Sequence, residues 1–501
     1  MAFLHQEGEN ILREYGHHPS FRMMALGNEL WGDIDKMKEF VDDFRKIAPD
    51  KYYTFGSNYY LGYQGIKEGM DYFTTCRIGG EGCGKYNTHT RGSFSFADAY
   101  DGGMINHFHP NSTMNFDEAC DKAGIPIISH ETGQFQTYPD YREIKKYTGV
   151  LHPYNFEVFR RRLAAAGMLS QADDFHKASG LWSVKLYKAD IEMDLRTRNM
   201  AGFQLLDIQD YPGQGSAFVG ILDAFMESKG ITTPEEWRLW CSPVVPLLEM
   251  KKFCFEDGEK IQAKVKVANY GGSSLKGKKL KWHLVAENGL FCMDDGTFST
   301  KDGEVRKNVS DLMAEDEGVL NIFSYDEGLV DVGELNGVFH VQKPTKLLLT
   351  LNIEGTEARN AYELWIYPKK ALEKKGVIIA KDLNEEVVKV LEKGGKVLWM
   401  PTASSHFVAA DDTLSQADNA TPYTVGGLFQ TDYWNYRMFK TICENNKKEN
   451  FSRNPGHSYE SGTSDIQGIP NGDAHQLGNG SRLSRNRIRW CLTTSSRIIA
   501  R

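Results

Sequence analysis

The stretch that decides the fold is HHPSFRMMALGNELWGD, residues 17–33. Residues 21–26 are a short apolar run, which is long enough for one buried strand. The run ends at a Gly-Asn-Glu triplet that closes with Glu29, and a polar Gly-Asp turn follows. A carboxylate at the carboxyl end of a buried strand is held rigidly while its head still reaches a cleft. The segment therefore predicts a strand that presents Glu29 at the rim of a sheet.

A second copy of this arrangement lies at IPIISHETG, residues 125–133. Here an apolar run leads into His130 and Glu131, and Thr-Gly ends the strand. If both strands reach the same rim, Glu29 and Glu131 form the pair of carboxyl groups that glycoside hydrolysis requires.

Composition restricts the class of protein. A chain of 501 residues predicts about two to four domains, and 41% hydrophobic with 25% charged residues is ordinary for a globular protein. A net charge of −8 argues against nucleic acid as a partner. The sequence has no apolar run long enough to span a membrane, and its N-terminus lacks a signal-peptide core. The eight Cys form no CxxC pairs, so we expect isolated thiols, and neither a metal nor a cofactor.

Residues 1–245 alternate strand-like and helix-like patterns, which is typical of an α/β fold. Asp33 is positioned to cap a helix over residues 34–47. The Arg160-Arg161-Arg162 run is expected on a solvated helix face. The remaining expected strands are residues 52–55, 71–78, 125–133 and 202–208. Residues 8–15 are expected to be the end of a helix, and further helices are expected at residues 116–123, 154–195 and 234–240.

After residue 245 the sequence pattern changes. Short strands separated by Gly, Asn and Asp predict an immunoglobulin-like β-sandwich over residues 247–368. A β-α-β pattern then opens a small α/β domain, residues 372–450. Residues 451–501 contain no Lys and have lost hydrophobic periodicity, which predicts a disordered tail, translated out of frame. The alternative is a basic arm for nucleic acid.

A Gly-rich stretch, residues 79–115, lacks clear periodicity, as functional loops often do. Within it, GGEGCGK at residues 79–85 has the spacing of a phosphate-binding loop. However, Tyr86 stands where such a loop needs Ser or Thr, and Glu81 would repel phosphate. Nucleotide binding is therefore disfavoured.

Three segments carry a family resemblance: HHPSFRMMALGNE, IISHETG and GFQLLDIQD. Together they resemble the second half of the catalytic barrel of glycoside hydrolase family 2, the β-galactosidase and β-glucuronidase group. The resemblance implies a partial (β/α)8 TIM barrel, strands four to eight, followed by an immunoglobulin-like sandwich. It also implies that Glu29 is the general acid/base and Glu131 the nucleophile, with a carbohydrate substrate and a periplasmic or secreted location.

A retaining mechanism needs one neutral and one ionised carboxyl group, so their pKa values must differ. Trp31 is expected to raise the pKa of Glu29 by desolvation. His130 and Gln134 are expected to keep Glu131 charged, and Asn28 to hold the sugar 2-hydroxyl. Further candidates for binding sugar hydroxyls are Arg77, His107, His109, Asp207, Gln209 and Tyr211.

Departures from the family leave alternatives open. The chain begins just before the fourth barrel strand, so we expect a fragment of a longer enzyme. HETGQF and LLDIQD also differ from well-known β-galactosidases. One alternative is an inverting hydrolase of the α-L-rhamnosidase type, whose carboxyl groups lie about 6.5–9.5 Å apart rather than about 5–5.5 Å. Another is an inactive carbohydrate-binding homologue that stacks sugars on Trp31, Tyr59 and Tyr60.

Overall fold

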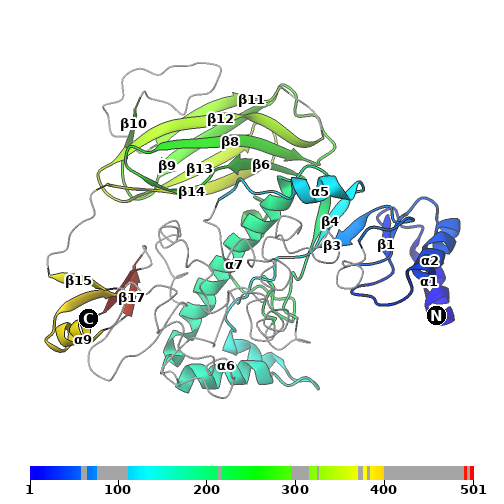
Figure 1. Ribbon diagram of the computed structural model, residues 1–501, viewed down its shortest axis with the longest axis horizontal. Coiled ribbons are helices and arrows are strands. Elements are labelled where there is room, and N and C mark those ends of the chain that lie inside the picture. The colour runs from blue at the N-terminus through cyan, green and yellow to red at the C-terminus, as the bar shows by residue number, and fades with distance from the viewer. Residues whose placement is uncertain are drawn as a thin grey trace.

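The computed structural model shows a mixture of helices and several sheets, as the sequence predicts (Figure 1). The residues that it describes are 1–57, 65–75, 111–165, 167–211, 217–294, 315–323, 327–369, 376–380, 384–399, 490–493 and 497–500.

The chain opens with two helices, α1 (Ala2–Tyr15) and α2 (Ile34–Ile47), that pack side by side (Figure 1). The Asp33 side chain accepts hydrogen bonds from the backbone N–H groups of Asp35 (2.9 Å) and Lys36 (3.3 Å). This contact satisfies amide groups that have no partner within the first turn of α2. The predicted helix over residues 34–47 and its cap are thus confirmed, and residues 8–15 form the end of α1, as predicted.

Five short strands run parallel through the first half of the chain. They are β1 (Met23–Ala25), β2 (Tyr52–Thr54), β3 (Phe73–Thr75), β4 (Ile127–Thr132) and β5 (Met200–Leu205). They form one two-stranded and one three-stranded sheet, and bridges from Ser57 to Asn28 and Thr74 connect the two. We refer to the five strands as the parallel array.

The strand expected at residues 21–26 exists, but the expectation that it is buried is wrong. Met23 is 41% exposed, while Phe73 and Ile127, on inner strands, are fully buried. β1 is the outermost strand of the parallel array, so its side chains have neighbours on one side only.

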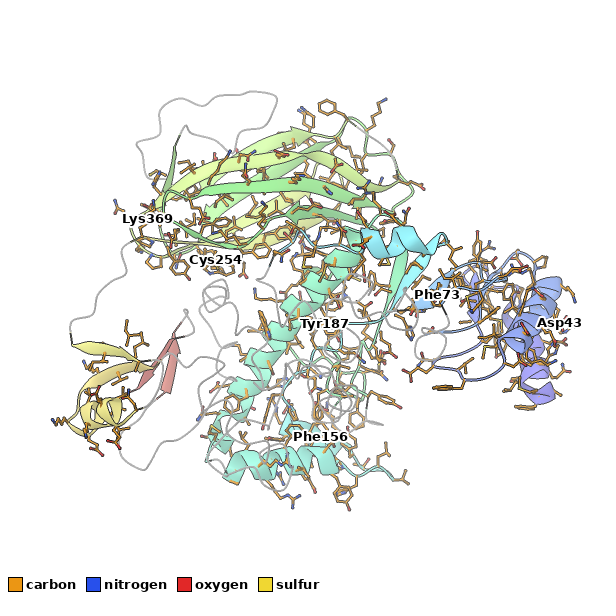
Figure 2. The ribbon with its side chains drawn as sticks, in the orientation of Figure 1. Asp43, Phe73, Phe156, Tyr187, Cys254 and Lys369 are labelled. Carbon is orange, nitrogen blue, oxygen red and sulfur yellow. The ribbon has the colours of Figure 1, made fainter. Side chains whose placement is uncertain are left out.

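Helices connect and cover these strands. They are α5 (Asp117–Ala123), α6 (Tyr154–Ala165), α7 (Ala172–Leu195) and α8 (Pro234–Trp237), with 3-10 turns at Tyr141–Lys146 and Leu169–Gln171. The helical stretch predicted over residues 154–195 is therefore two helices. Arg160 and Arg161 are exposed, as predicted, on α6. Most of α7 is buried: its first half packs near α6, and its second half lies beside β4, β5 and the following sandwich (Figures 1 and 2).

A two-sheet sandwich follows, and its strands alternate between inward and outward side chains. One sheet has the order β10-β12-β8-β6, and the other has the order β11-β9-β13-β14-β7. Their bounds are β6 (Val244–Glu249), β7 (Cys254–Glu256), β8 (Lys260–Asn269), β9 (Lys279–Ala286), β10 (Phe291–Asp294), β11 (Glu315–Asn321), β12 (Gly328–Val341), β13 (Thr345–Ile353) and β14 (Arg359–Tyr367). Leu347, Leu349 and Leu351 are fully buried in the core between the two sheets. All pairings are antiparallel except β7 with β14.

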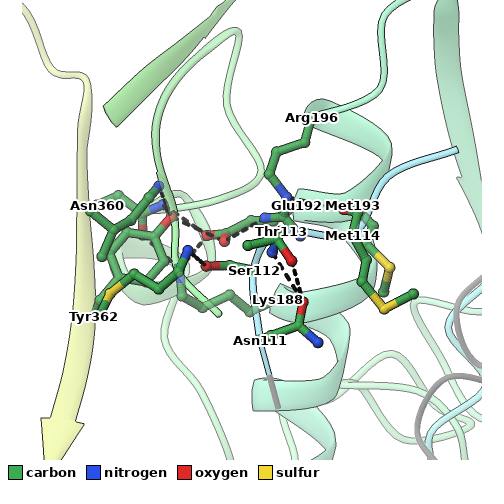
Figure 3. Close-up of polar contacts among 12 residues, drawn as sticks. Asn111, Ser112, Thr113, Met114, Lys188, Glu192, Met193, Arg196, Asn360 and Tyr362 are labelled. Atoms are coloured by element: carbon green, nitrogen blue, oxygen red, sulfur yellow. Dashed lines mark hydrogen bonds and ion pairs between the residues drawn. The ribbon is translucent and has the colours of Figure 1, made fainter. Parts of the chain in front are cut away.

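A buried polar network joins α7 to the sandwich (Figure 3). The Glu192 carboxylate accepts hydrogen bonds from the Asn360 amide (2.8 Å) and the Tyr362 hydroxyl (3.0 Å). Lys188 forms an ion pair with Glu192, and Arg196 lies 3.5 Å from the other carboxylate oxygen. Because these groups are buried and mutually paired, the network fixes the position of α7 against β14.

The predicted β-α-β unit is present as β15 (Val377–Ala380), α9 (Glu385–Glu392) and β16 (Lys396–Trp399), with the two strands parallel. β17 (Trp490–Thr493) and β18 (Arg497–Ala500) pair with each other, and β18 pairs with β16. At these two segments the structure departs from the expected disordered tail. Both are apolar at alternate or consecutive positions, a pattern that favours strands.

Candidate active site

The candidate site lies where strands β1, β4 and β5 end. Nε2 of His130, on β4, lies 2.8 Å from Oδ1 of Asn28, which follows β1. Nδ1 of the same ring lies 2.8 Å from Oε1 of Gln204, on β5. One imidazole therefore ties together the ends of three strands. Asn28 and His130 immediately precede Glu29 and Glu131, so the two predicted motifs meet at one rim.

A β-bulge places Glu131. Ser129 pairs with Phe203, but Thr132 pairs with Leu205, so three steps along β4 match only two along β5. A bulge of this kind re-aims side chains and is common beside active sites. Glu131 adopts a left-handed backbone conformation with φ of 55°.

Glu29 has a similar backbone conformation, with φ of 50°. Its N–H donates to the Ser57 carbonyl oxygen at 2.8 Å, which holds the turn against the neighbouring strand. In the described part of the chain, the non-glycine residues with positive φ are Glu29, Glu131, Gln134, Asn199 and Met226. Such residues cost about 1–3 kcal/mol each and gather at functional sites. Three of these five belong to the predicted site.

The two Glu residues lie in different surroundings. Oε1 of Glu131 is 3.7 Å from Nε2 of His130, and these side chains are only 12% and 14% exposed, respectively. Glu29 is exposed, and Trp31 is 66% exposed. The expectation that Trp31 desolvates Glu29 is therefore wrong. Trp31 follows the turn after β1, an edge strand of the parallel array.

The other predicted sugar-binding residues that the structure describes are Gln134, Asp207, Gln209 and Tyr211. Gln134 is only 4% exposed, whereas Tyr211 is 48% exposed. Oδ1 of Asp207 accepts a hydrogen bond from the N–H of Ile208, and Gln209 forms a backbone bridge with Leu222. The peptide bond between Leu206 and Asp207 is cis. Outside the described residues lie Arg77, His107, His109, Tyr59, Tyr60 and the 79–85 loop.

Sequence reasoning missed several residues that build this rim. Gln204 is the one polar side chain among residues 200–205, and that contrast could have marked it. Asp190 and Asp194 lie on α7, beneath β4. A long helix gives no sequence signal about which of its acidic residues face a strand, so these two could not have been found.

Three further features concern metal binding, membrane spanning and the cysteines. Among the described residues, no group of three or more His, Cys, Asp or Glu side chains is arranged to hold a metal ion. Within the same part of the chain, no helix is both long and apolar enough to cross a membrane. Of the Cys in described segments outside the last sheet, Cys120, Cys241, Cys254 and Cys292 form no disulfide.

Comparison with known proteins gives limited similarity. A family model described as a domain of unknown function, DUF8488, matches residues 315–368. No curated protein matches. The chain is similar to a solved β-glucuronidase of Parabacteroides merdae, with 10% identity, TM-score 0.29, and coverage of 75% of this chain and 41% of that one. The chain is likewise similar to a solved β-glucuronidase of Bacteroides uniformis, with 10% identity, TM-score 0.30, and coverage of 79% of this chain and 38% of that one.

The chain is also similar to a conjugative transposon lipoprotein of Bacteroides eggerthii, with 9% identity, TM-score 0.18, and coverage of 25% of this chain and 96% of that one. At such TM-scores these likenesses carry no argument about the site. The chain spans about two fifths of the length of the two glucuronidases.

Proposed function

We propose that the chain is part of a retaining glycoside hydrolase that cleaves terminal glycosidic bonds, with Glu29 as general acid/base and Glu131 as nucleophile. The observation that carries the proposal is the 2.8 Å contact between Asn28 and His130. It joins the residues that precede the two carboxylates, which come from strands far apart in the chain. The left-handed conformations of Glu29 and Glu131 support the same assignment.

The chemistry assigned to the two carboxyl groups is a double displacement. Glu131 attacks the anomeric carbon and forms a bond to it, while the bond from that carbon to the leaving oxygen breaks. Glu29 donates its proton to that oxygen, then removes a proton from the water that hydrolyses the glycosyl-enzyme. Glu29 is exposed at the rim, so the water that it deprotonates in the second step can reach it. Asn28 is assigned the role of holding a sugar hydroxyl next to the reacting carbon.

The fold assignment belongs to the same proposal. The parallel array is interpreted as strands four to eight of a (β/α)8 barrel, and its carboxyl-end rim as the catalytic face. The sandwich is interpreted as immunoglobulin-like. The substrate is a carbohydrate, and a periplasmic or secreted location suits a glycan-degrading enzyme.

Azide rescue tests the proposal. On a 2,4-dinitrophenyl β-glycoside, Glu131→Ala should regain turnover with azide and yield the α-glycosyl azide, because azide enters from the face that Glu131 leaves open. Glu29→Ala should yield the β-glycosyl azide instead, from the glycosyl-enzyme. Glu39→Ala, which removes an exposed carboxylate on α2, is the control and should match the parent.

Two alternatives predict other results. An inverting hydrolase releases its first sugar product with the opposite anomeric configuration, which NMR detects. A carbohydrate-binding homologue binds sugar with no turnover in the parent, and both Glu variants keep that binding. Either result would remove the retaining assignment.

A further inference from the structure

Helix α7 places two carboxyl groups directly beneath β4. Asp190 and Asp194 are one helical turn apart, so their side chains project from the same face of the helix. They are only 1% and 2% exposed. Burial of two neighbouring carboxyl groups is costly, and apolar side chains would pack the same space at lower cost. Two buried carboxyl groups at this position therefore indicate a specific role.

Asp190 holds the backbone just after Glu131. Its Oδ2 accepts a hydrogen bond from the N–H of Gly133 at 3.0 Å. Gly133 has φ of 98°, a conformation that a side chain disfavours. The ring of Tyr187, also on α7, fills the space where a Cβ of Gly133 would lie. The Tyr187 hydroxyl in turn donates to the Val219 carbonyl oxygen at 2.6 Å, which fixes the ring.

Asp194 lies against the side chains on either side of the bulge. The hydroxyl groups of Ser129 and Thr132 are 2.9 Å from each other and lie near the Asp194 carboxyl group, neither of whose oxygens has a hydrogen-bond partner among the described residues. Burial, reinforced by the negative charge of Asp190, raises the pKa of Asp194 well above its ordinary value.

Asp190 thus holds the backbone at Gly133, two residues after Glu131, and Asp194 lies near the side chains of Ser129 and Thr132, on either side of Glu131. We propose that Asp190 is a positioning residue that holds the bulged end of β4 so that the Glu131 carboxylate keeps its reactive orientation. This inference rests on the proposed function, because it assigns a role toward the nucleophile. Neither Asp reaches the rim itself, so neither is a catalytic residue.

The kinetics of covalent trapping test the inference. The probes are the 2,4-dinitrophenyl 2-deoxy-2-fluoro-β-D-galactoside and the corresponding β-D-glucuronide. In trapping, the Glu131 oxygen bonds to the anomeric carbon as dinitrophenolate leaves with the electron pair of the broken bond. The maximal labelling rate and the concentration for half-maximal rate are measured separately. A misplaced nucleophile lowers the maximal labelling rate, whereas partial unfolding lowers the fraction of protein that becomes labelled.

Matched variants separate positioning from stability. Asp190→Ala removes the acceptor for the Gly133 N–H, and Asp190→Asn keeps one. Asp194→Asn retains the shape of the Asp194 side chain. Ile191→Val trims a fully buried side chain of the same helix and serves as the control for lost stability. If Asp190→Ala does not fold, Asp190→Ser, whose hydroxyl is too short to reach Gly133, replaces it.

We expect Asp190→Ala to lower the maximal labelling rate about tenfold or more, with the half-maximal concentration little changed. Asp190→Asn, Asp194→Asn and Ile191→Val should stay within about threefold of the parent. A rate for Asp190→Ala equal to that of Ile191→Val would overturn the inference while the proposed function stands. A parent chain that is never labelled at Glu131 would instead overturn the proposed function, and this inference with it.

Discussion

Oδ1 of Asn28 lies 2.8 Å from Nε2 of His130, although 102 positions separate the two residues in the chain. The contact spans from one edge strand of the parallel array to β4, and Gln204 extends it to β5. It means that the Gly-Asn-Glu and His-Glu motifs belong to one constellation. Because Asn28 precedes Glu29 and His130 precedes Glu131, we expect a substitution at His130 to shift the positions of both carboxylates.

His130→Ala should therefore reduce turnover strongly. Its loss frees Asn28 and Gln204 and removes the imidazole 3.7 Å from Glu131. Misplacement of catalytic groups by about 1 Å lowers rates about 100-fold, so we expect a fall of that order in kcat on aryl glycosides. The control is His152→Ala, which removes an exposed imidazole ahead of α6. Equal rates for His130→Ala and the parent would refute a role for this ring.

Gly133→Ala should destabilise the fold. The added Cβ would lie 2.0 Å from the Tyr187 ring, and the φ of 98° strains any side chain. We expect a loss of about 3 kcal/mol in the free energy of unfolding, measured by urea denaturation. The comparison is Gly149→Ala, where a Cβ meets no atom within 4 Å and little change is expected. Similar losses at both positions would be inconsistent with the close packing of Tyr187.

Glu143 should make stability depend on pH. Burial, with the nearby charge of Asp210, raises the pKa of Glu143 to about 8 from an ordinary value of 4.5. As pH rises from 4.5, the unfolded chain loses this proton while the folded chain keeps it, so the group disfavours folding increasingly up to about pH 8. Glu143→Gln removes the effect.

The variant should therefore unfold at the same urea concentration as the parent near about pH 5, and at a higher concentration near about pH 8. Glu39→Gln, at an exposed position on α2, controls for the loss of a carboxylate. A difference between Glu143→Gln and the parent that does not vary with pH would show that Glu143 is ionised in the fold.

Asn360→Ala should loosen the junction between α7 and the sandwich. The Asn360 amide donates to the buried Glu192 carboxylate and to the Pro246 carbonyl oxygen, both at 2.8 Å. Loss of both bonds leaves a buried charge less well paired, at a cost of about 3 kcal/mol. Asn352→Ala, on the exposed face of β13, should change the free energy of unfolding by less than about 0.5 kcal/mol. Equal effects in denaturant titrations would refute the network's contribution.

Local sequence patterns were enough to predict several elements. Asp33 and the apolar spacing that follows define α2, because cap and periodicity act within a few residues. The β-α-β unit and the alternating strands of the sandwich follow from the same local rules. The exposure of Trp31 and Met23 could not be predicted, since burial depends on which strand is outermost in the array.

In the candidate site, too, some residues could be predicted from local sequence and others could not. Glu29 and Glu131 are recognisable because a carboxylate follows an apolar run in each case. The bulge at Glu131 and the carboxyl groups of Asp190 and Asp194 depend on how β4 meets β5 and α7. Such contacts join residues about 60 positions apart, and single-sequence periodicity carries no information about them.

The central claim is that Glu131 is the nucleophile of a sugar-cleaving site shared with Glu29. Its most direct test is to incubate the chain with the 2,4-dinitrophenyl 2-deoxy-2-fluoro-β-glycosides and locate the label by peptide mass spectrometry. We predict one fluorosugar on Glu131, which persists in Glu29→Gln because dinitrophenolate leaves without a proton. Label on another residue, or no label with any of these sugars, would contradict the account.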